Sequence, residues 1–177
     1  MRWMWIDQIV AIEPERRLVA VKNLSLAEEF FHDHFERETA ADDSSREPLP
    51  IMPAPLIIEG MAQTGGILVG HTNGFREKVV LAKISKAIFD RDAQPGQTLR
   101  YEATLDLMDA SGASIVGRVE VFDHTVGEWL PLAQIELIFS HIDQNRAGVV
   151  FPEENFVFTD NFRALLDSAG LLPANLS

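Results

Sequence analysis

The sequence predicts an α+β fold in which a long central helix is buried against a curved antiparallel sheet. Residues 56–69 are apolar on nearly every face, as in a helix that is enclosed on all sides. From residue 79 onward, apolar and polar residues alternate over several segments, which is typical of half-buried strands. Two strand-like segments precede the helix, so we expect strands from both sides of it to form one sheet.

The first part of the chain predicts a hairpin followed by a short helical turn. Residues 3–12 are rich in Trp, Ile and Val, which favour a strand, and a proline follows in a segment of turn residues. Residues 17–24 alternate and predict the return strand. Ser25 is placed to cap a helical turn over residues 26–30, with Glu28 in the capping-box position.

The stretch that leads into the central helix carries the most specific pattern. Residues 36–47 are polar without periodicity and predict an exposed loop, while Pro55 suits the first turn of the helix. Glu59 is the only charged residue between Pro48 and Phe75. Burying a carboxylate is costly unless it is paired or protonated, so Glu59 is the leading candidate functional residue.

The second half of the chain predicts four more strands and a terminal helix. The expected strands cover residues 79–89, 99–107, 114–123 and 130–141. Near the C-terminus, Thr159 can cap a helix that Gly170 closes. The apolar residues of this helix share one face: Phe162, Leu165, Leu166 and Ala169. We assign residues 1–145 to a single domain and residues 146–177 to an extension that contains this short helix.

Composition excludes several classes of function. The 177 residues include 15 Lys and Arg against 27 Asp and Glu, and a net charge of −12 disfavours binding to nucleic acid. The chain has no Cys, which excludes disulfides, thiolate zinc sites and Cys nucleophiles. No motif points to a cofactor, and the spacing of His32 and His34 alone does not make a metal site. With no signal-peptide pattern and no bilayer-length apolar run, we expect a soluble, cytoplasmic protein without a membrane span.

Three blocks of the sequence occur in the order found in a known enzyme family. They read WIDQIVAIEPERRLVAVKNLSLAEEFFHDHF, PIMPAPLIIEGMAQTGGIL and KISKAIFDRDAQPGQTLRYEATL. In these blocks, residues 5–142 resemble the hot-dog-fold 3-hydroxyacyl-(acyl-carrier-protein) dehydratases of fatty acid synthesis. The resemblance implies a hot-dog fold, an acyl thioester substrate on acyl carrier protein or CoA, and a homodimer, with a trimer of dimers as the larger assembly.

The resemblance also implies the site residues. The family's catalytic His falls on His34, and its Glu-x-Met-x-Gln motif falls on Glu59 and Gln63. His34 would then be the base that takes a proton from C2, and Glu59 of the other subunit the acid that protonates the leaving hydroxide. Backbone N–H groups near Ala54 and Leu56, at the start of the central helix, would bind the thioester carbonyl. Gln63 would either orient Glu59 or fill a polar gap.

Two alternatives to the dehydratase stay open, and departures from the family pattern favour the second of them. Asp33 and Ala54 stand where the family has Gly, Pro55 has no N–H, and residues 36–47 contain an insertion. The first alternative is a hot-dog thioesterase or enoyl hydratase that acts on acyl-CoA. The second is a non-catalytic hot-dog subunit that binds acyl chains or an active paralogue. In that case His34 would be an ordinary loop histidine and Glu59 a paired core carboxylate.

Overall fold

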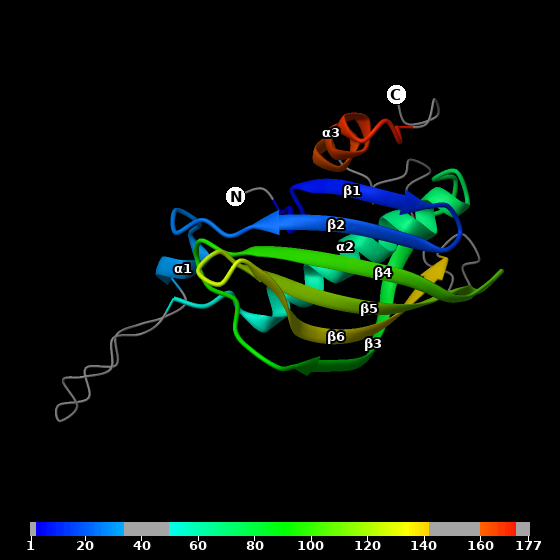
Figure 1. Ribbon diagram of the computed structural model, residues 1–177. Coiled ribbons are helices and arrows are strands. Elements are labelled where there is room, and N and C mark those ends of the chain that lie inside the picture. Colours follow the sequence, from blue (N-terminus) through cyan, green and yellow to red (C-terminus); the bar gives the residue numbers. More distant parts are fainter. Residues whose placement is uncertain (1–2, 34–49, 142–159, 173–177) are drawn as a thin grey trace.

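The computed structural model describes residues 3–33, 50–141 and 160–172 of the chain. A long helix lies along one face of a curved sheet, and a shorter helix lies beside the first strand (Figure 1). The strands are β1 (Gln8–Glu13), β2 (Arg17–Asn23), β3 (Val79–Phe89), β4 (Thr98–Asp109), β5 (Gly112–Asp123) and β6 (Glu128–His141). The helices are α1 (Phe30–Asp33), α2 (Ala54–Thr72) and α3 (Asp160–Ser168).

The six strands form one antiparallel sheet in the order β1-β2-β4-β5-β6-β3. Strands β4, β5 and β6 follow one another as a meander, whereas α2 carries the chain across the sheet from β2 to β3. The helix contacts β2, β3, β4, β5 and β6, so its apolar faces are covered by the concave side of the sheet. The predicted α+β arrangement is therefore confirmed, and all four strands expected after the central helix are present.

Helix α2 extends beyond the apolar run of residues 56–69, by Ala54 and Pro55 at its start and by Gly70, His71 and Thr72 at its end. Pro53 precedes it and Pro55 lies in its first turn, where the missing N–H costs no helical hydrogen bond. The helix ends at Asn73, whose N–H donates to the carbonyl of Gly70 at 3.2 Å. Gly60 lets the sheet approach closely, since a Cβ there would lie 2.5 Å from Tyr101 Cζ.

Two local predictions near the N-terminus are wrong. The first strand begins at Gln8 rather than at residue 3, because the backbone of Trp3 and Trp5 bonds to the side chain of Gln63 on α2 instead of to a strand. Glu28 does not complete a capping box, since its carboxylate accepts a hydrogen bond from Lys22 Nζ at 2.5 Å. The first contacts join residues that are 58 and 60 positions apart, and the second joins β2 to the segment that follows it.

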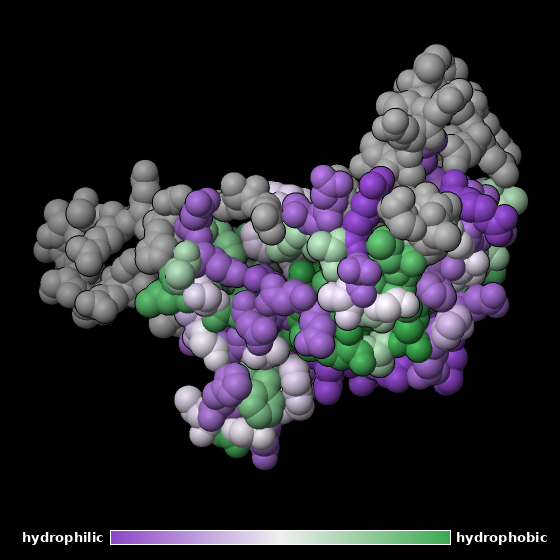
Figure 2. All heavy atoms as spheres, turned by 90° about the horizontal axis from the view of Figure 1, so that it is seen from above, coloured by the Kyte–Doolittle hydropathy of each residue, from purple (hydrophilic) through white to green (hydrophobic). Residues whose placement is uncertain are grey.

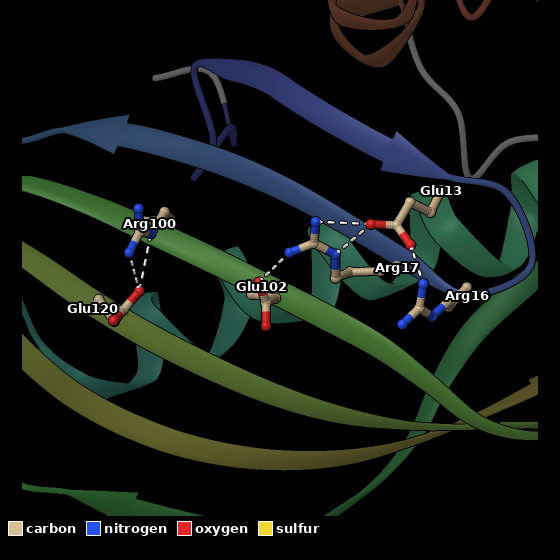
Figure 3. A network of polar contacts seen from close by, with 6 residues as sticks. All are labelled: Glu13, Arg16, Arg17, Arg100, Glu102 and Glu120. Atoms are coloured by element: carbon tan, nitrogen blue, oxygen red, sulfur yellow. Dashed lines mark hydrogen bonds and ion pairs between the residues drawn. The ribbon is translucent and has the colours of Figure 1, made fainter.

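The outer face of the sheet is polar and carries ion pairs. Arg17 Nη2 lies 2.8 Å from Glu13 and Arg17 Nη1 lies 2.6 Å from Glu102. Arg16 contacts the second oxygen of Glu13 (Figure 3). The hydrogen bond from Arg17 holds the pKa of the Glu13 carboxyl below its usual value. These pairs lie at the surface and are partly open to solvent, so each contributes little to stability. They establish that this face of β1, β2 and β4 lies outward.

The C-terminal helix predicted from the apolar pattern is confirmed as α3. Leu165 and Leu166 are buried, the helix contacts β1, and Gly170 follows it with a φ of +68°. The predicted cap, Thr159, lies outside the described residues.

The face that carries α3 and β1 is mainly hydrophilic, with apolar residues gathered in patches between the polar ones (Figure 2). No helix within the described ranges is long and apolar enough to cross a membrane.

Strand β3 is the least covered element of the sheet. It pairs only with β6 and lies at the end of the strand order. Residues 81–85 are exposed without interruption, so both faces of the strand are open there. Ile84 and Ile88 are 46% and 48% exposed, which is high for large apolar side chains in a strand.

Candidate active site

Glu59 lies in the first half of α2 and is half-buried rather than enclosed. Its Oε1 atom accepts hydrogen bonds from Trp3 Nε1 and from Gln63 Nε2, each at 3.1 Å. Two N–H groups therefore fix one oxygen of the carboxyl group. A carboxyl group held in this way has a defined position from which it can exchange a proton with a ligand.

Gln63 lies one turn beyond Glu59 and is almost fully buried, at 6% exposure. Its Oε1 accepts the backbone N–H of Trp5 at 2.8 Å, and its Nε2 donates to the carbonyl of Trp3 at 3.2 Å as well as to Glu59. The acceptor and both donors of the amide are thus in use. This geometry connects Gln63 to the Glu59 carboxylate and fixes the orientation of the amide.

Trp3 is a member of this cluster that sequence reasoning missed. Its indole ring packs edge-on against Trp5 with centroids 5.4 Å apart, and its Nε1 reaches Glu59 across 56 positions of the chain. The feature of the sequence that could have identified Trp3 is its indole N–H, a hydrogen-bond donor in an aromatic N-terminal segment. This role was missed because the segment was predicted to be a strand.

Glu59 and Gln63 line a cavity of about 320 Å³ whose other walls are apolar. The walls come from α2, from the first residues of β3, from Phe139 on β6 and from Phe162 on α3. Its size is at the lower end of the range for small-molecule sites. Apolar walls with one carboxyl group suit a ligand that has an alkyl part and a polar end.

The remaining predicted site residues lie in two places. Ala54 is the exposed first residue of α2, and the N–H of Leu56 donates to the carbonyl of Pro53 at 2.9 Å. The Leu56 amide is therefore committed to the helical turn, which leaves Ala54 as the candidate donor at the helix start. His34 lies outside the described residues, directly after α1.

A second cavity, of about 560 Å³, lies at the C-terminal end of α2. His141 Nδ1 and Glu77 Oε2 are 2.5 Å apart on its wall, and Glu15 and Asp109 also line it. It shares no lining residue with the Glu59 cavity. Within the described part of the chain, no group of three or more His, Asp or Glu residues is arranged to hold a metal ion.

The architecture is that of the hot-dog fold. It resembles a dehydratase heterocomplex, ApeI:P, from Xenorhabdus doucetiae, with a TM-score of 0.58 and 16% identity over 78% of this chain and 83% of that one. An acyl-CoA hydrolase from Agrobacterium tumefaciens gives a TM-score of 0.54 at 16% identity, over 76% of this chain and 46% of the other. Likenesses at this identity establish the fold.

The family follows from sequence comparison. The FabA-like domain matches residues 2–126, so this chain belongs to the FabA-like family. The 3-hydroxyacyl-acyl-carrier-protein dehydratase FabZ of Clostridium tetani is 35% identical over 124 residues, which are 70% of this chain and 80% of the relative. The FabZ of Koribacter versatilis is 33% identical over 132 residues, 73% of this chain and 78% of the relative.

Proposed function

We propose that the protein dehydrates (3R)-hydroxyacyl thioesters to trans-2-enoyl thioesters in the fatty acid synthesis of the cytoplasm. The observation that carries the proposal is the carboxyl group of Glu59, held by two N–H donors on the wall of an otherwise apolar cavity. Relatives at 33–35% identity are named as 3-hydroxyacyl-acyl-carrier-protein dehydratases, which supports the same reaction here. By the same argument, the thioester is carried on acyl carrier protein, with CoA as the alternative carrier.

The reaction needs one base and one acid. His34 takes the proton from C2, the electron pair of that C–H bond forms the C2–C3 double bond, and the C3–O bond breaks. Glu59, in its protonated form, gives its proton to the departing hydroxide, so water leaves. A positioned acid and base each contribute about 10²–10⁴ to the rate. The amide of Ala54 would polarise the thioester carbonyl at the start of α2.

A second copy of the chain completes this site in the proposal. The β3 edge carries the exposed Ile84 and Ile88 beside Lys83 and Lys86, and the same strand of another copy can pair on its open side. His34 of one protomer would then face Glu59 of the other. We propose a homodimer as the functional unit, with a trimer of dimers as its larger assembly.

The helix start supports a second candidate function, an acyl-binding subunit without turnover. Pro55 has no N–H, and the Leu56 amide is already bonded to Pro53. The first turn therefore has fewer donors for a thioester oxygen than a helix without these two features. A chain-binding cavity would remain even if catalysis were lost.

The test compares turnover of a (3R)-hydroxyacyl thioester on acyl carrier protein and on CoA. Wild type is expected to release the trans-2-enoyl product, and His34→Ala and Glu59→Gln are each expected to lose at least about 10²-fold in kcat. Glu128→Gln, at an exposed position on β6, is the matched control and should retain wild-type activity.

Mixing the two inactive variants tests the shared site. Random exchange makes half of the dimers mixed, and each mixed dimer has one intact site of two, so about a quarter of wild-type activity should return. No recovery would contradict a site that is shared between protomers. No turnover of either thioester by wild type would leave the acyl-binding subunit as the function.

A further inference from the structure

Helix α3 lies beyond the residues that the family model matches, and it contributes to the Glu59 cavity. The FabA-like match ends at residue 126, and α3 spans Asp160–Ser168. Phe162, on the first turn of this helix, lies on the wall of the same cavity that Glu59 and Gln63 line. A residue far beyond the matched stretch therefore forms part of the wall of the candidate site.

The position of Phe162 is set by packing. Leu165 and Leu166, on the next turn, are 7% and 0% exposed and belong to the main hydrophobic core. The helix contacts β1, the strand that directly follows the segment in which Trp3 bonds to Glu59. Phe162 thus enters the cavity wall from an anchored helix, with its aromatic ring half-buried.

The facing walls are rigid elements of the sheet and of α2. Phe139 comes from the paired part of β6, and Val79 and Val80 begin β3. Gly66 of α2 also lines the cavity, and a Cβ added there would meet only Phe139 Cε1, at an ordinary 3.7 Å. The volume of about 320 Å³ is therefore bounded by two aromatic rings, and one of them belongs to α3.

We propose that Phe162 is a specificity-determining residue that limits the length of the acyl chain bound beside Glu59. Its role in turnover rests on the proposed dehydratase function, whereas its role in binding an alkyl chain does not. Removing the ring would lengthen the cavity toward α3. Enlarging the ring would shorten it.

The experiment uses the full-length chain in four forms: wild type, Phe162→Ala, Phe162→Trp and Arg163→Ala. Arg163 is the exposed neighbour on the same helix and serves as the control. Turnover is measured on short-chain and long-chain 3-hydroxyacyl thioesters. Binding is measured separately, by displacement of the fluorescent fatty acid cis-parinaric acid with octanoate and with dodecanoate.

Phe162→Ala is expected to raise two ratios by about tenfold or more: kcat/KM for the long-chain over the short-chain thioester, and affinity for dodecanoate over octanoate. A change of this size is what a single methylene group contributes in a fitted pocket. Phe162→Trp should shift both ratios downward, and it also covers the case in which Phe162→Ala fails to fold. Arg163→Ala should match wild type. Ratios that stay at the wild-type value in both Phe162 variants would overturn the proposal.

The two proposals fail in different ways. Absence of dehydration in wild type, together with shifted fatty acid affinities in the Phe162 variants, would overturn the dehydratase function and support the role of Phe162. Dehydration with unchanged chain-length ratios would support the function and overturn that role.

Discussion

At the scale of single residues, the position of the candidate acid depends on an unusual donor. Trp3 Nε1 and Gln63 Nε2 both bond the same oxygen of Glu59, but only Gln63 belongs to the motif shared with the family. Two hydrogen bonds to one oxygen restrict the rotation of the carboxyl group. The N-terminal aromatic segment is therefore part of the candidate site as well as of the core.

Two glycines of α2 face different surroundings, and their substitutions should have opposite effects on stability. A Cβ at Gly60 would lie 2.5 Å from Tyr101 Cζ and 3.0 Å from the carbonyl oxygen of Trp5, whereas at Gly66 it makes only an ordinary contact. Gly60→Ala should lower the free energy of unfolding by about 1–3 kcal/mol through overpacking. Gly66→Ala should raise it by up to about 1 kcal/mol through helix propensity.

Chemical denaturation of the two glycine variants, followed by circular dichroism, measures both effects. The variants share a helix and a substitution, so each is the control for the other. A Gly60→Ala protein as stable as wild type would contradict the close approach of the sheet to α2.

At the scale of elements, a buried lysine joins β2 to the segments on either side of it. Lys22 Nζ bonds Asp7 before β1 at 3.2 Å and Glu28 before α1 at 2.5 Å, and its side chain is 9% exposed. Burial by itself lowers the pKa of Lys22, but the hydrogen bond to Glu28 and the charges of Asp7 and Glu28 outweigh it, so the pKa is raised. The network fixes the turn from which the chain continues to His34.

The raised pKa of Lys22 predicts a loss of stability at alkaline pH. Because the folded-state pKa lies above the unfolded one, the stabilisation is complete below about pH 10 and is lost as the pH rises through the folded value. Lys22→Met should lower the free energy of unfolding by about 3 kcal/mol at neutral pH, since it leaves Glu28 half-buried and unpaired. The difference from wild type should shrink above the unfolded pKa.

Denaturation curves of wild type and Lys22→Met across the alkaline range measure this difference. Burial, together with the charges of Asp7 and Glu28, raises the pKa of Tyr101, which also destabilises the fold at high pH. Because Lys22 pairs with the same two carboxylates, both proteins are compared in a Tyr101→Phe background, which removes this titration. A difference that does not change with pH would contradict the lysine linkage.

At the scale of the whole molecule, the exposed β3 edge predicts self-association. Ile84→Lys places a charge on that edge and should convert a dimer into monomers, with loss of turnover because the proposed site needs both copies. Val116→Lys is the control, since Val116 is equally exposed but lies in β5, away from the sheet edge. Sedimentation velocity gives the mass of each. A wild-type monomer, or an Ile84→Lys dimer, would contradict this interface.

The sequence by itself determined the parts of the fold that depend on neighbouring residues. The apolar run of α2, the alternation in β4 and β5 and the one-sided pattern of α3 each appear in the structure near their predicted bounds. The contact between Glu59 and Gln63 could also be predicted from the sequence, because positions four apart lie on the same face of a helix. Hydrophobic periodicity and helical spacing are local properties, so a local pattern predicts them.

Only the tertiary structure decided which distant residues meet at the site. Trp3 reaches Glu59 because β1 begins at Gln8 and the segment before it turns toward α2. Phe162 enters the cavity because Leu165 and Leu166 are buried in the core, a contact that no spacing in the chain encodes. Such contacts depend on the curvature of the sheet and on which part of it the N-terminal segment and α3 cover. The packing of the complete chain sets both.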